Sequence, residues 1–95
     1  MKNGVELENL KEITRDLFER LIQEDEEVKT GLHKLKSDDV DFSMVAYYNG
    51  LIMGKVGRVL AEASVDVPVK TLMTIVNELI TEKGGKTHEY TGDKI

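Results

Sequence analysis

Two short acidic runs are the residues of this chain that come nearest to metal-binding chemistry. They span positions 24–27 and 38–41, and carboxylates are the ligands that hard divalent cations prefer. The second run lacks the glycine and the distal glutamate of a calcium-binding EF-hand loop. We therefore expect its aspartates to lie at the N-terminus of the following helix, and the first run to be a solvated helix boundary. No metal site and no cofactor is predicted.

The side chains that could act as nucleophiles or general bases are isolated from one another. His33 and His88 are the only histidines, and neither has a ligand-spaced neighbour. There is no cysteine, no nucleophile elbow, no HExxH motif and no glycine-rich phosphate loop. Ser43 and Ser64 are better explained as a cap and a small packing residue. The sequence predicts no catalytic residue and no enzymatic activity.

A row of small residues at steps of three or four positions is the most distinctive pattern in the chain. Its members are Ser43, Ala46, Gly50, Gly54, Gly57, Ala61 and Ser64. On a helix these residues form one face without large side chains. Each helical glycine costs about 0.8–1 kcal/mol relative to alanine, so close packing must offset roughly 3 kcal/mol. The row therefore predicts either packing of a central helix inside the domain or a seam for self-association.

Four amphipathic helices are expected to position these residues, over 5–23, 26–36, 42–63 and 68–83. The first and fourth helices are expected to pack on the third. The expected apolar positions are Leu7, Leu10, Ile13, Leu17, Phe18 and Leu21, then Val28, Leu32 and Leu35, then Val45, Tyr48, Ile52, Val56 and Val59, then Val69, Leu72, Met73, Val76, Leu79 and Ile80. Gly84 and Gly85 are typical of a helix C-terminus.

The third segment has a competing interpretation as a β-hairpin. Asn49-Gly50 is a strong hairpin signal, and β-branched and aromatic residues flank it. The helix is favoured because apolar residues become contiguous after the turn, which breaks the period of two. The segment from Lys55 onward has clear helical spacing.

Composition describes one small acidic domain. The chain has 95 residues and a net charge of −5, with 33% charged residues. From position 42 onward six acids balance six bases, so no broad phosphate-neutralising surface is expected. The N-terminus lacks the apolar core of a signal peptide, and Asn49, Lys55 and Arg58 interrupt the longest apolar stretch. A cytoplasmic protein that does not span a membrane is expected.

The order of elements after Lys55 resembles a winged helix-turn-helix. The resemblance lies in residues 56–63, a tight connection, and a helix from Val69, followed by Gly-Gly and a wing at 85–95. It implies DNA binding by the helix from Val69. Two departures are Asp66 at the usual turn glycine and a recognition helix with one early lysine. The residues that would face nucleic acid are Lys55, Arg58, Lys70, Thr71, Thr74 and Lys86, with Asn77 on the same helix.

Taken whole, the chain resembles a small family of short proteins from hyperthermophilic archaea of the Pyrococcus and Thermococcus group. The similarity lies in length, in residues 47–54 and in the helix from Pro68 to Gly85. It implies no activity, ligand or catalytic residue, and it favours a thermostable intracellular protein. The high charged fraction agrees with thermostability.

These observations predict a mainly α domain over 1–95, with a flexible tail or a small β-hairpin at 86–95. The expected function is non-catalytic protein interaction, and self-association into a homo-oligomer is the expected form. The expected interface residues are Gly50, Leu51, Met53, Gly54 and Gly57. The alternative is a winged-helix-like nucleic-acid-binding regulator. A basic cluster of Lys55, Arg58, Lys70 and Lys86 would favour the alternative, and an exposed apolar patch would favour interaction.

Overall fold

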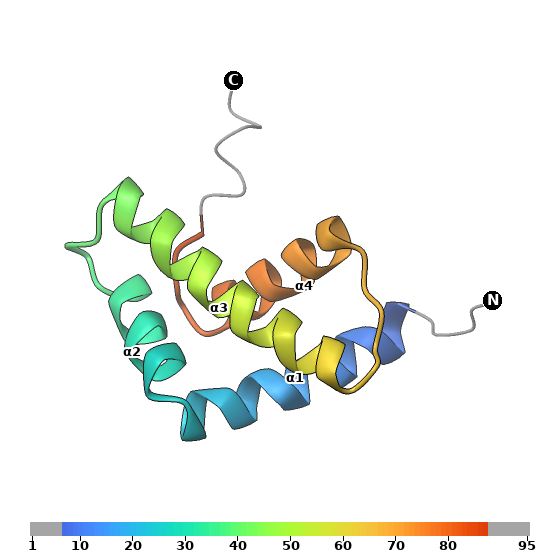
Figure 1. Ribbon diagram of the computed structural model, residues 1–95. Coiled ribbons are helices and arrows are strands. Elements are labelled where there is room, and N and C mark those ends of the chain that lie inside the picture. The colour runs from blue at the N-terminus through green and yellow to red at the C-terminus, as the bar shows by residue number, and fades with distance from the viewer. Residues whose placement is uncertain (1–6, 88–95) are drawn as a thin grey trace.

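Four helices make up the part of the chain that the computed structural model describes, residues 7–87 (Figure 1). They are α1 (Leu7–Glu24), α2 (Glu26–Leu35), α3 (Phe42–Glu62) and α4 (Val69–Glu82). No strand occurs within these residues, so the mainly α prediction is confirmed. The expected start of the first helix at position 5, His88, and the parts of the expected wing at 85–95 and of the expected tail or β-hairpin at 86–95 that follow residue 87 lie outside the described residues. Between residues 7 and 87 no helix is long and apolar enough to cross a membrane.

The third segment is one helix throughout, and the hairpin alternative is wrong. Asn49 and Gly50 lie in the middle of α3. Asp41 precedes the helix, and its carboxylate accepts a hydrogen bond from the Met44 amide at 2.9 Å, as expected for an aspartate N-cap. The helical register gathers the apolar side chains into one buried stripe, which a hairpin would have split between two faces. The buried members are Val45, Ile52, Val56 and Leu60.

A single residue, Asp25, separates α1 from α2. Its backbone is extended, and its carboxylate Oδ1 accepts hydrogen bonds from the amides of Glu27 at 2.9 Å and Val28 at 3.2 Å. These bonds satisfy two of the amides that a helix N-terminus leaves without partners. The chain therefore turns without a proline or glycine, and the acidic run is a capped helix boundary.

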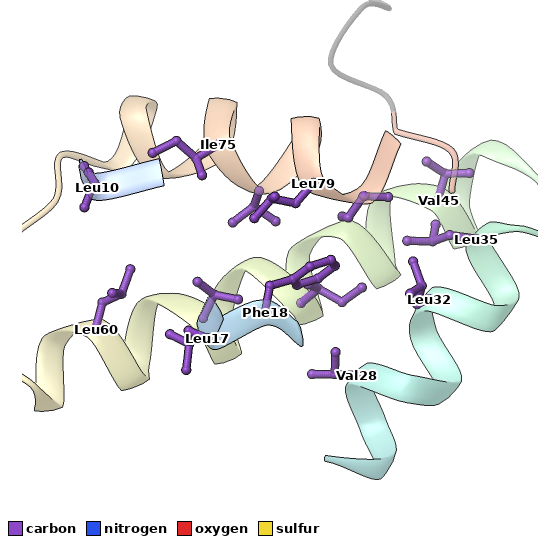
Figure 2. Packing of buried hydrophobic residues seen from close by; sticks show 14 residues of the cluster. Leu10, Leu17, Phe18, Val28, Leu32, Leu35, Val45, Leu60, Ile75 and Leu79 are labelled. Atoms are coloured by element: carbon purple, nitrogen blue, oxygen red, sulfur yellow. The ribbon is translucent and has the colours of Figure 1, made fainter. Parts of the chain in front are cut away.

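The core gathers side chains from all four helices (Figure 2). Phe18 of α1 lies near its middle, between Leu79 of α4 and the α2 side chains Val28 and Leu32. We expected α1 and α4 to pack on α3, and α2 makes the most extensive contact with it. Gly31 explains this contact, because a Cβ atom there would lie only 3.2 Å from Cδ1 of Tyr48. The absent side chain lets α2 approach α3 closely.

Three expected core residues are largely outside the core. Ile13 is 44% exposed and Val69 is 65% exposed, and Met73 also lies at the surface. Ile13 lies at the edge of the α1 stripe, and Val69 belongs to the first turn of α4. Conversely, Thr14 is completely buried, because its hydroxyl donates to the carbonyl of Leu10 at 2.7 Å and so needs no water.

After α4 the chain passes the C-terminal end of α2 and the first half of α3. The Lys86 amide donates to the carbonyl of Leu35, at 3.0 Å, and the Asn49 side chain donates to the Lys86 carbonyl, at 3.1 Å. The Lys86 ammonium reaches the carbonyl of Ser37 at 2.9 Å. These bonds attach Lys86, the first residue of the expected tail, to α3 and to the C-terminal end of α2.

Candidate interaction surface

The outer side of α3 carries the small residues predicted from the sequence. Ser43, Gly50, Gly54 and Ala61 are all exposed, and we call these four residues the small-residue face. A Cβ atom placed on Gly50 or Gly54 would meet no described atom within 4 Å. Packing within the domain is therefore the wrong explanation for these two glycines. Both glycines lower the stability of the helix, and no close approach of another element between residues 7 and 87 compensates for this loss.

Gly57 differs from the other two glycines because α4 approaches it. A Cβ atom on Gly57 would lie 2.9 Å from Cδ2 of Leu72. Close packing of α3 against α4 is thus the reason for a glycine at this one position. Of the interface residues predicted from the sequence, Gly50 and Gly54 are exposed, whereas Gly57 is partly covered by α4.

The exposed side of α3 is also without charge over its first half. No charged residue occurs from position 42 to position 54, although an outward helix face is usually charged or polar. Tyr47 is 64% exposed and continues the row of small residues, four positions after Ser43 and three before Gly50. Leu51 and Met53 are half-buried on either side of this row. The surface is an uncharged strip with one large aromatic side chain.

The expected nucleic-acid residues on α3 are occupied by contacts within the chain. The Lys55 ammonium lies 3.2 Å from Oδ2 of Asp25 and 2.5 Å from a carboxylate oxygen of Glu27. Arg58 pairs with Glu62 at 3.4 Å. These pairs reduce the positive charge that the two bases present to solvent.

The remaining candidates of the nucleic-acid alternative are dispersed. Lys86 binds Ser37, beyond the C-terminus of α2, whereas Lys55 contacts the start of α2, about 15 Å away for a ten-residue helix. Lys70 is exposed on the first turn of α4, and the Thr74 hydroxyl donates to its carbonyl at 3.0 Å. Thr71 is half-buried. The described residues therefore do not bring the four bases into one cluster.

Asp25 and Lys55 form a structural ion pair, and each shifts the pKa of the other. Partial desolvation raises the pKa of Asp25, but the hydrogen bond from the Val28 amide and the charge of Lys55 outweigh it, and the pKa is lowered overall. Hydrogen bonds to Glu27 and Asp25 raise the pKa of Lys55. Both shifts favour the charged forms. No cluster of three metal-ligating side chains occurs within residues 7–87.

A hollow of about 550 Å³ lies between α1 and the connection from α3 to α4. Its lining is mostly apolar, and it consists of Leu10, Ile13, Ser64, Val65, Asp66, Pro68 and Thr71. No histidine or lysine lines it, so Ser64 and Asp66 have no base or positive charge beside them there. The hollow gives no support to acid–base or nucleophilic catalysis.

Two buried asparagines are the feature that sequence reasoning missed. Asn49 and Asn77 are each more than nine-tenths buried, on α3 and α4, and both line a smaller hollow of about 160 Å³ between these helices. The nucleic-acid alternative requires Asn77 to face outward, and its burial contradicts that expectation. Its position one residue after Val76 of the apolar stripe is the signal that indicates burial.

Similarity to known proteins assigns no role to this surface. No protein-family model matches this chain, and no curated protein or solved structure is significantly similar to it.

Proposed function

We propose that this protein is a non-catalytic interaction module that self-associates through the exposed side of α3. The observation that carries the proposal is the pair Gly50 and Gly54, which are exposed on α3 and where an added Cβ atom would meet no described atom of a neighbouring element within 4 Å. Such residues lower helix stability, and a second helix backbone is the partner that glycines admit most closely. The absence of charge over positions 42–54 supports a partner surface of the same neutral kind.

A second copy of the chain supplies such a surface. The protein carries a net charge of −5, and two acidic chains repel each other at most of their surface. Contact through the uncharged strip of α3 minimises this repulsion. A homodimer with twofold symmetry, in which each copy offers the same strip, is the simplest assembly that covers both strips.

Sedimentation velocity from micromolar to millimolar concentration tests the proposal. We expect a monomer–dimer equilibrium for the wild type and a monomer for Gly54→Leu, because a leucine there separates the helices. The Gly54→Leu chain should keep its fold, since the position is open and leucine has the higher helix propensity. Gln23→Leu, which adds the same side chain at an exposed position of α1, is the matched control and should still dimerise.

Two outcomes would contradict this function. A wild type that stays monomeric at millimolar concentration removes self-association, and a Gly54→Leu chain that dimerises as the wild type does removes α3 as the interface. Fluorescence anisotropy with a mixed-sequence DNA duplex at low salt tests the nucleic-acid alternative, and we expect no binding.

A further inference from the structure

A small hollow between α3 and α4 opens beside the small-residue face. Its volume is about 160 Å³, and it is lined by Ala46, Asn49, Gly50, Met53, Met73 and Asn77. The two helices that form it are in contact, and they cross in the view of Figure 1. At roughly 30 Å³ per water molecule, the hollow has room for about five waters. It is smaller than the sites of about 300–1,000 Å³ that hold drug-sized ligands, and its size suits one side chain.

Asn77 lines this hollow, and among residues 7–87 nothing hydrogen-bonds to its side chain. The residue is only 7% exposed. Asn49, on the opposite wall, donates to the carbonyl of Lys86. A buried amide without a partner is unfavourable, and such groups are rare in folded proteins. A hydroxyl group that enters the hollow from a partner would give the Asn77 amide a hydrogen bond within the protein assembly.

We propose that the hollow receives the Tyr47 side chain of a second copy of this chain, with the tyrosine hydroxyl hydrogen-bonded to Asn77. The inference rests on the proposed self-association and specifies its contact. Tyr47 is the one exposed aromatic residue in the uncharged strip that also has a hydrogen-bonding group. Its ring suits the apolar walls formed by Met53 and Met73, because methionine sulfur and aromatic rings attract each other.

The positions along α3 make this contact reciprocal. In an antiparallel pair of α3 helices with a twofold axis between residues 48 and 49, Tyr47 lies opposite Gly50 of the other copy. Ser43 then lies opposite Gly54, so both of these pairs include a glycine and the two backbones approach closely there. The Tyr47 side chain of each copy then reaches the hollow of the other copy at the same time. The Tyr47 ring now rests edge-on against Tyr48, with centroids 5.0 Å apart, so insertion requires a side-chain rotation.

Dissociation constants of a few variants test the contact, measured by sedimentation equilibrium. We expect Tyr47→Ala to raise the dimer dissociation constant at least tenfold. Tyr47→Phe and Asn77→Ala should each raise it several-fold, and the double variant should be no weaker than either one, because both remove the same hydrogen bond. Ile13→Ala truncates an exposed apolar side chain on α1 and should leave the constant unchanged.

The outcomes separate this contact from the proposed function. If Gly54→Leu abolishes the dimer but Tyr47→Ala does not weaken it, self-association through α3 stands and the tyrosine contact is overturned. If the effects of Tyr47→Phe and Asn77→Ala add, the hydroxyl does not meet the amide, and the proposal is also overturned. A monomeric wild type overturns both. Tyr47 is exposed, so its variants keep the fold, and thermal unfolding of Asn77→Ala checks that it does too.

Discussion

The ammonium of Lys55 lies 3.2 Å from Oδ2 of Asp25, and this contact joins the middle of α3 to the junction of α1 and α2. Asp25 also caps α2 through its other carboxylate oxygen. One side chain thus fixes the start of a helix and its position against a neighbouring helix. The lysine that the nucleic-acid alternative assigns to DNA is instead part of the fold.

The pH dependence of stability should reveal this ion pair. The pKa of Asp25 is lowered, so its contribution is present above its unfolded pKa of about 3.9 and is lost as pH falls through the folded value. The pKa of Lys55 is raised, so its contribution is complete below about 10.4 and is lost as pH rises through the folded value. We expect Lys55→Gln to lower Tm by a constant amount from about pH 5 to 9, with the difference shrinking below about pH 4.

Differential scanning calorimetry across this pH range measures the difference. Arg58→Gln is the control, because the Arg58–Glu62 pair is far more exposed and should contribute little at any pH. A Tm difference for Lys55→Gln that persists unchanged to pH 3 would show that the lysine acts through packing of its chain rather than through the carboxylate.

Alanine substitutions should separate the exposed glycines of α3 from the packed one. Gly54→Ala gains helix propensity in open space, so we expect stabilisation by about 1 kcal/mol. Gly57→Ala gains the same propensity but brings a methyl group to 2.9 Å from Leu72, so the gain should be smaller or absent. Urea unfolding of the wild type and both variants at the same low micromolar concentration gives both free energies. Equal stabilisation by the two variants would contradict the close contact of α3 with α4.

Sequence periodicity was sufficient for the helices because each has a single apolar stripe. The predicted start of α2 at Glu26 and of α3 at Phe42 is the observed one, since capping aspartates precede both. Periodicity could not locate the small-residue face relative to the rest of the molecule. Whether Gly50 is covered depends on which part of α3 contacts α4. This arrangement of the two helices is a tertiary property that periodicity does not contain. For the same reason the sequence predicts that Asn77 faces outward with the other polar residues of its helix, although the residue is buried on the side of α4 that faces α3.

The C-terminal ends of α3 and α4 have the same hydrogen-bonding pattern but different residues at its critical position. After α3, the amides of Ser64 and Val65 donate to the carbonyls of Ala61 and Leu60, at 3.0 and 2.8 Å. After α4, the amides of Gly84 and Gly85 donate in the same way, both at 2.9 Å. This Schellman motif requires a left-handed residue, and the φ angles are 63° at Ser64 and 88° at Gly84.

Glycine adopts this conformation without strain, whereas serine does so at a cost. We therefore expect Ser64→Gly to stabilise the protein by roughly 0.5–1 kcal/mol and Gly84→Ala to destabilise it by about 1 kcal/mol. Ala63→Gly is the control, because Ala63 has an ordinary φ of −89° and glycine there should only add disorder to the unfolded chain. Thermal unfolding of the three variants measures these differences. If Ser64→Gly lowers Tm, the serine hydroxyl contributes more than its backbone strain costs, and the left-handed turn is held by that side chain.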